Sequence, residues 1–204
     1  MTKSSLKSFY DLVHYTDEDG YEHFLPLDYV SGGVLSASHQ ENTLFKGQKF
    51  AAWGIQASTA IDGAYDIVLR TPAGATAYTH LMKIEGWVDG GQCRLQLLET
   101  PTTATSDTAF TPVNQNRLST DTSGVEIETS ATVTVGAAVQ VDEKVFGGGT
   151  SKKGDLGAGA GPGVAQYILD TSTTYVIRAL NKSADSSTVS IRLTWAEHSR
   201  GIET

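Results

Sequence analysis

The chain has 204 residues, of which 39% are hydrophobic and 19% charged, and its 21 glycines favour strands and turns over helices. Fifteen basic and 23 acidic residues give a formal net charge of −8, which argues against a phosphate backbone as the main binding partner. One cysteine excludes an intrachain disulfide, and no apolar run approaches the roughly 20 residues of a membrane span, so we expect a protein made in the cytoplasm with no membrane or nucleic-acid partner.

The first 45 residues differ from the rest of the chain. Apolar residues cluster there without a sustained period, around an acidic turn at 17–20 and the turn-prone Ser31-Gly32-Gly33. We expect residues 1–45 to form an extended arm that packs on its own domain or on a neighbour. A partly disordered terminus is the alternative.

From residue 46 onward, apolar and polar residues alternate in one short segment after another, which is the period of half-buried strands. The predicted strands cover residues 49–56, 65–70, 77–87, 92–99, 125–135, 139–146, 164–169, 174–180 and 188–198. Asp89-Gly90-Gly91 predicts a hairpin between two of them, and the polar residues 181–187 predict a second, closing hairpin. The strand at 125–135 is expected to have one wet face.

These strands determine the expected fold class. Strands that follow one another without helical crossovers pair mostly antiparallel, and burying one face of each requires two packed sheets or a closed barrel. The sequence therefore predicts an all-β protein, in which residues 46–204 form an antiparallel β-sandwich of jelly-roll type and residues 1–45 form the arm. An up-and-down barrel is the alternative.

No segment carries a recognisable catalytic or metal-binding pattern. Residues 147–154 contain glycines and lysines, but a P-loop needs Gly-Lys-Ser or Gly-Lys-Thr at the start of a helix, so we expect a mobile loop. Asp17 and Asp19 lack the later ligands of a calcium loop. The five histidines show no zinc-type spacing. We expect His80 to be partly buried, Cys93 to be a small core residue, and the chain to bind neither cofactor nor metal.

Several short segments carry a family resemblance. They are the Pro-Ala-Gly turn at 72–74, His80–Glu85, Arg94–Glu99, Thr111–Arg117, and the ending from Thr174–Arg178 to Leu193–His198. In this order they resemble a family of tailed-bacteriophage virion proteins, usually described as capsid decoration or head-stabilising proteins. The similarity covers about residues 40–198, and its most specific parts are Asn114-Gln115-Asn116-Arg117 and Trp195-Ala196-Glu197.

The resemblance implies a non-enzymatic cement protein on the outer capsid surface of the virion. Such proteins commonly form trimers that bridge subunits of the major capsid protein. By this implication residues 46–198 form the trimer, and the arm contacts the capsid protein or a neighbouring protomer. The arm residues assigned to this contact are Phe9, Tyr10, Leu12, Phe24, Leu25 and Leu27.

Two other functions fit an all-β sandwich, because a fold does not fix a function. A carbohydrate-binding or adhesin module on the virion or tail requires exposed aromatic platforms, for which Trp53, Trp87 and Tyr78 are candidates. Trp87 is out of register with Met82 and Ile84 and is therefore predicted to face outward. A cupin-like enzyme would need clustered histidines and carboxylates, which the sequence does not offer.

Overall fold

The chain divides into two units, Met1–Glu41 and Asn42–Thr204. The computed structural model describes residues 14–16, 22–24, 44, 46–74, 77–105, 108–129, 131–148, 152–156 and 167–199. In the first unit β1 (His14–Thr16) pairs antiparallel with β2 (Glu22–Phe24). Of the arm residues assigned to a contact, Phe24 ends β2, and the following lie outside the described residues: Phe9, Tyr10, Leu12, Leu25 and Leu27.

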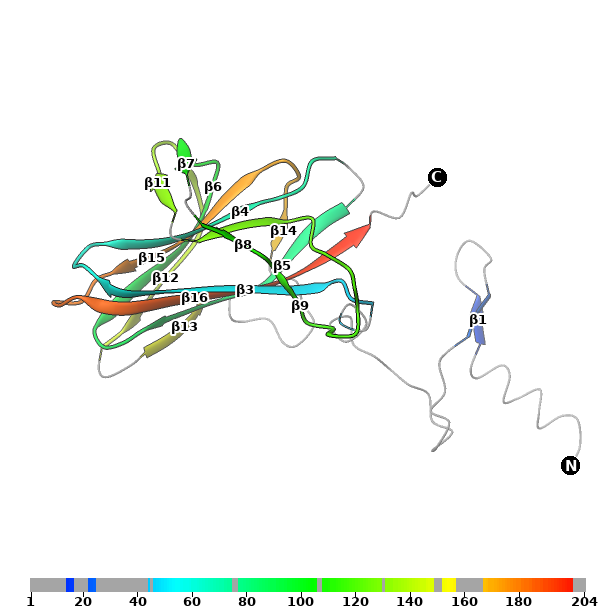
Figure 1. Cartoon of the computed structure of the whole chain (residues 1–204), viewed down its shortest axis with the longest axis horizontal. Helices are drawn as coiled ribbons and strands as arrows, with labels where there is room; N and C mark the ends of the chain where they lie inside the picture. The colour runs from blue at the N-terminus through cyan, green and yellow to red at the C-terminus, as the bar shows by residue number, and fades with distance from the viewer. Residues whose placement is uncertain are drawn as a thin grey trace, which may run out of the picture. The chain divides into compact units, whose positions relative to one another are not determined.

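The second unit contains two large antiparallel sheets, seen as two layers in Figure 1. Sheet 1 has the order β12 (Val139–Gly147), β6 (Gln92–Glu99), β15 (Thr174–Asn181), β4 (Ala64–Arg70), β10 (Glu126–Thr129) and β8 (Thr108–Phe110). Sheet 2 has the order β13 (Lys152–Leu156), β5 (Ala77–Val88), β16 (Ser187–Ser199), β3 (Lys49–Thr59) and β9 (Val113–Asn114), and β14 (Tyr167–Leu169) also pairs with β5. The predicted all-β antiparallel sandwich is confirmed, with two sheets in place of one closed barrel.

The core lies between the two sheets and follows the predicted alternation. In β4, Tyr65, Ile67 and Leu69 are fully buried and belong to one continuous apolar cluster with residues of both sheets. Trp195 of β16 is also fully buried and stacks on Phe50 of β3, with 6.1 Å between the ring centroids. Aromatic side chains contribute the largest apolar areas to such a core, so this pair anchors β3 to β16.

Both predicted hairpins are wrong, because the strands on either side of each turn lie in opposite sheets. β5 pairs with β16 and β6 pairs with β15, so each strand takes its partner from the other end of the chain. The two turns become neighbouring corners between the sheets. Asp89 N donates to Thr188 O at 3.0 Å, and Lys182 N donates to Gln92 O at 2.8 Å. Turn residues signalled a reversal correctly, but a reversal between sheets has the same local chemistry as one within a sheet.

Two residues of these corners have requirements that only tertiary contacts explain. Gly91 has a φ of +70°, and a Cβ atom there would lie 2.0 Å from the Cβ of Ser183. Asn181 is fully buried, and its Nδ2 donates to Thr59 O at 2.8 Å and to Asp185 O at 2.9 Å. Asn181-Lys182-Ser183 matches a glycosylation acceptor formally, but the enclosed amide of Asn181 serves the corner instead.

The strand predicted over residues 125–135 is interrupted. β10 belongs to sheet 1, whereas β11 (Thr132–Thr134) pairs with β7 (Thr103–Thr105) in a separate two-stranded sheet. Ile127 points into the main core, while Val133 packs on a second cluster formed by Val68, Leu98 and Val176 on the outer face of sheet 1. Apolar and polar residues alternate throughout 125–135, so the pattern does not reveal that the chain passes from sheet 1 to the separate two-stranded sheet.

The glycine-rich segment also differs from the prediction. We expected a mobile loop at residues 147–154, but Lys152, Lys153 and Gly154 lie in β13 and pair with Val88, Trp87 and Gly86 of β5. Glycine and lysine are weak strand formers, so composition alone favoured a loop. The free edge of β5 supplies the partner that overrides this propensity.

The two-stranded sheet of β7 and β11, which we call the β7–β11 flap, covers part of the outer face of sheet 1. An ion pair between two charged side chains also lies on this face. Arg178 and Asp66 lie opposite each other in β15 and β4, and Nε and Nη2 of Arg178 donate to the two carboxylate oxygens at 2.8 and 2.7 Å. Arg178 Nη2 also donates to Val133 O at 3.1 Å, which ties the flap to the sheet. Both charged side chains are largely buried.

Replacing Arg178 by Ala should destabilise the protein strongly. The substitution leaves the buried Asp66 carboxylate without its partner, for which we expect a loss of about 3 kcal/mol in the free energy of unfolding. Lys182→Ala is the matched control, because its exposed ion pair with Asp62 at 2.6 Å is expected to be worth about 1 kcal/mol or less. Urea unfolding measures both, and equal losses would contradict the central role of the Arg178–Asp66 pair.

Candidate functional site

The outer face of sheet 2 carries the most exposed aromatic surface among the described residues. In β3, β16 and β5 the core residues alternate with outward ones, and the register places outward residues in rows. One row is Trp53, Arg192 and Glu85, and the next is Ile55, Ser190 and Trp87. We call these six residues the sheet 2 face. The prediction that Trp87 faces outward is confirmed.

The two indoles of the sheet 2 face have different surroundings. Trp53 has 49% of its surface exposed, yet its ring meets Phe110 edge-on with 5.2 Å between the centroids. Trp87 is half-buried and lines a shallow hollow of about 190 Å³. The other residues around the hollow are Glu85, Gly86, Ser190 and Arg192. The face therefore combines two aromatic rings with hydrogen-bonding groups.

The charged groups of the sheet 2 face differ in whether they form ion pairs. Glu85 Oε1 forms an ion pair with Lys83 Nζ at 3.0 Å. Arg192 is exposed, and no ion pair joins it to any residue in the described part of the chain. In the register of β13, Asp155 lies opposite Glu85 and Lys153 lies opposite Trp87. Together with Glu85, Lys83 and Arg192, these two residues give a formal charge of one positive, and Arg192 lies on the middle strand of the face.

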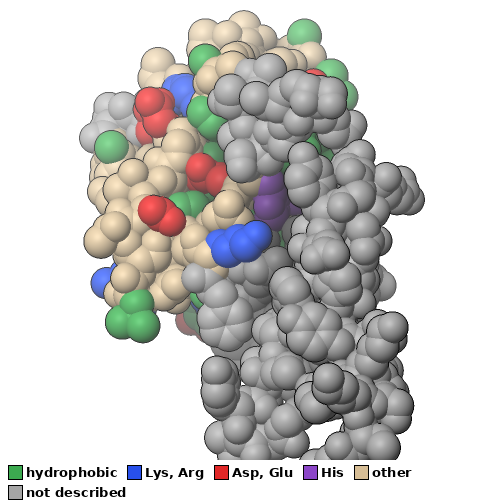
Figure 2. Space-filling model, turned by 90° about the vertical axis from the view of Figure 1, so that its right-hand side faces the viewer, with side chains coloured by type: hydrophobic (Ala, Val, Ile, Leu, Met, Phe, Trp, Pro, Cys, Tyr) green, Lys and Arg blue, Asp and Glu red, His purple; other side chains and the backbone are tan. Residues whose placement is uncertain are grey.

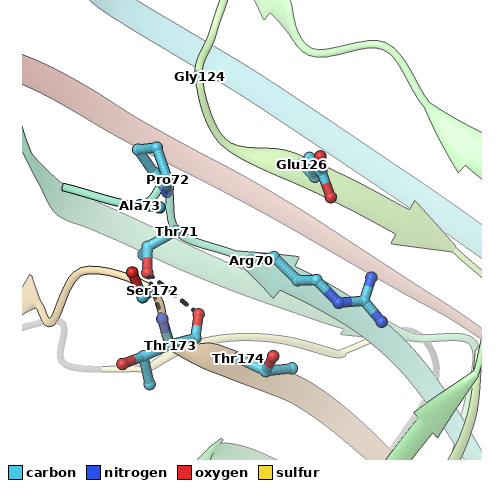
Figure 3. A pocket seen from close by; sticks show the side chains of 9 residues that line it. All are labelled: Arg70, Thr71, Pro72, Ala73, Gly124, Glu126, Ser172, Thr173 and Thr174. Carbon is cyan, nitrogen blue, oxygen red and sulfur yellow. Dashed lines mark hydrogen bonds between the residues drawn. The ribbon is translucent and has the colours of Figure 1, made fainter.

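A polar cleft lies at the end of the sandwich where β4 ends and β10 and β15 begin (Figure 3). Its volume is about 220 Å³. Thr71 Oγ1 donates to Asp170 O at 2.6 Å and accepts from Thr173 N at 2.9 Å, so it fastens two turns together. The Arg70 side chain points away from the Thr71 turn toward Glu128, which it pairs at 2.6 Å. These groups serve the fold, and their arrangement provides no nucleophile with an adjacent base.

The two motifs that carry the family resemblance meet at one end of the body. Asn114 Nδ2 donates to Gly47 O at 2.8 Å and to Asp121 O at 3.0 Å. Glu197 accepts from Trp195 Nε1 at 2.9 Å and from Gly124 N at 2.8 Å. Both side chains therefore hold the loop of residues 115–124.

The loop of residues 115–124 presents an apolar side chain to solvent. Leu118 is 95% exposed, and its backbone N donates to Asn116 Oδ1 at 3.1 Å. Arg117 beside it is also exposed. Asn114 and Glu197 thus hold the loop in place, and Arg117 and Leu118 form its exposed surface.

A histidine pair was not foreseen from the sequence. His80 of β5 and His198 of β16 have ring centroids 4.4 Å apart, and Tyr78 stacks on His80 at 5.4 Å. Figure 2 shows histidine side chains at the surface of the body. Pairing of β5 with β16 brings these rings together, so only the strand register could have predicted it. No group of three or more His, Cys, Asp or Glu suited to a metal ion occurs among the described residues.

Comparisons with known proteins add no relative: no protein-family model and no curated protein sequence matches the chain. Within the described residues, no helix is long and apolar enough to cross a membrane.

Cys93 should be inert toward thiol reagents while the protein is folded. The prediction that it is a core residue is confirmed, because it is fully buried in the main cluster, and burial raises the pKa of its thiol to about 12. At pH 8 only about one thiol in ten thousand is then ionised. We expect reaction with a disulfide reagent only after unfolding in guanidinium chloride. Rapid labelling of the native protein would contradict the buried position.

Glu197→Ala should weaken both the core and the loop of residues 115–124. The buried Trp195 Nε1 loses its acceptor, which we expect to cost about 2 kcal/mol in unfolding free energy. The loop also loses its anchor at Gly124, so trypsin should cleave faster after Arg117. Glu197→Gln keeps an acceptor oxygen and should show a smaller effect in both assays. Unchanged stability and cleavage in the Ala variant would show that the loop is held by other contacts.

Proposed function

We propose that the chain is a tailed-phage virion protein that binds the outer capsid surface as an oligomer and stabilises the head. The observation that carries the proposal is the division of the chain into the unit Met1–Glu41 and the β body Asn42–Thr204. A cement protein needs a rigid body and a separate segment that grips the shell. Such a protein requires no catalytic centre.

We infer that the body is a jelly roll. Its eight principal strands, with β13 and β14 counted as one, pair first with eighth, second with seventh, third with sixth and fourth with fifth. The order first, eighth, third, sixth in sheet 2 and second, seventh, fourth, fifth in sheet 1 is that of a long hairpin wound into two sheets. This order supports the inference, and it agrees with the jelly-roll type that the strand pattern of the sequence predicts.

The proposed mechanism divides the work between the two units. Three bodies associate, and the arms contact the major capsid protein through apolar side chains. The arm residues proposed for this contact are Phe9, Tyr10, Leu12, Phe24, Leu25 and Leu27. Three linked arms of modest affinity can gain about 10²–10⁴ in avidity without any new contact. Because the arms bind only the assembled shell, binding makes disassembly more costly.

Co-sedimentation with undecorated, expanded phage heads tests this function. We expect the full chain to be a trimer, three times the 21.7 kDa chain mass, to pellet with heads and to raise their disruption temperature. Deletion of residues 1–40, or the triple variant Phe9→Ser, Leu12→Ser, Leu25→Ser, should leave a folded trimer that no longer pellets. Leu118→Ser is the matched control, because it removes an exposed apolar side chain from the body and should still bind.

The possible failures are distinguishable. A monomeric full chain that ignores heads would contradict the decoration function itself. A truncated trimer that binds with full affinity would contradict only the role assigned to the arm. Loss of binding in Leu118→Ser would transfer the capsid contact to the loop of residues 115–124.

A further inference from the structure

The two faces of the sandwich differ in what covers them. The β7–β11 flap covers part of the outer face of sheet 1, where its apolar residues pack on Val68, Leu98 and Val176. The sheet 2 face has no such cover in the described residues, and it keeps Trp53 49% and Ile55 65% exposed. Neighbouring exposed apolar side chains rimmed by polar residues are a feature of ligand-binding grooves and interaction sites.

The size of the sheet 2 face favours a small ligand over a protein. The six residues occupy two outward positions on each of three strands, a patch of roughly 10 by 7 Å between backbone positions. A stable protein interface needs about 800 Å² from each partner, several times this area. The hollow beside Trp87 is about 190 Å³, which is close to the liquid volume of about six water molecules and suits one hexose ring.

The chemistry of the sheet 2 face matches a sugar. The flat faces of Trp53 and Trp87 can cover the C–H face of a pyranose ring, as indoles are both apolar and polarised. Between them, Ser190 can donate and accept hydrogen bonds, and Arg192 offers up to five donors. Trp53 and Trp87 are separated by β16 and by two positions along the strand, about 12 Å in all. This span suits a short oligosaccharide.

We propose that the sheet 2 face binds an acidic oligosaccharide, with Trp53 and Trp87 stacking on sugar rings and Arg192 binding a sugar carboxylate. The anionic preference follows from the local charge balance, because Glu85 is paired with Lys83 and Arg192 is left to receive an anion. A guanidinium and a carboxylate form two parallel charge-assisted hydrogen bonds. The proposal does not depend on the capsid-decoration function.

Isothermal titration of the full chain with two probes tests the proposal. Tetragalacturonate carries carboxylates, and cellotetraose is its neutral counterpart. We expect tetragalacturonate to bind about tenfold or more tightly than cellotetraose, and Arg192→Gln to remove this preference. Trp53→Ala and Trp87→Ala should weaken binding of both probes about tenfold. Leu118→Ala is the control for an exposed apolar residue elsewhere and should bind as the unaltered chain does.

Three results would overturn the proposal. The first is the absence of saturable binding of either probe by the unaltered chain. The second is tetragalacturonate binding that is unchanged in Arg192→Gln, a variant of an exposed side chain that is expected to fold normally. The third is a fall in sedimentation coefficient in Trp53→Ala or Trp87→Ala at an unchanged melting temperature, which would identify the face as a contact between copies of this chain.

Discussion

The pairing of strands from opposite ends of the chain is the constraint on which the rest of the structure depends. β3 pairs with β16, β4 with β15 and β6 with β12, so each half of the chain completes the sheets begun by the other. The core can close only when β16 is in place, because β16 contributes Trp195, one of the largest fully buried side chains. The corners at Gly91 and Asn181 follow from this pairing, since the two turns must pack side by side.

The same pairing makes the two outer faces different. On sheet 1 the Arg178–Asp66 pair and the β7–β11 flap cover part of the outer face, and Val145 of β12 stays 50% exposed. On sheet 2 Trp53, Ile55 and Arg192 are exposed, whereas Glu85, Trp87 and Ser190 are half-buried. Among the described residues, only the outer face of sheet 1 carries a further pair of strands.

Residues that look like a functional signature can serve the fold. Asn114 and Glu197 satisfy buried or strained backbone and indole groups at the end of the sandwich, where the sheet ladders stop supplying partners. Such residues are hard to replace, because each makes several bonds at once. The surface they create, at Arg117 and Leu118, has no comparable internal constraint.

The sequence by itself determined the all-β class and the long strands with their inward faces, because alternation with a period of two is a local property. The short strands β7, β8, β9 and β13 were not predicted. The sequence also placed Cys93 in the core and Trp87 on the outside. Tertiary structure alone decided which strands are neighbours. The predictions of hairpins at 89–91 and 181–187, of a single strand at 125–135 and of a loop at 147–154 were therefore wrong. The Trp53–Arg192–Glu85 row and the His80–His198 pair were not foreseen, because both depend on strand register. Strand pairing joins residues far apart in the chain, and local chemistry is the same whether a turn stays in one sheet or crosses to the other.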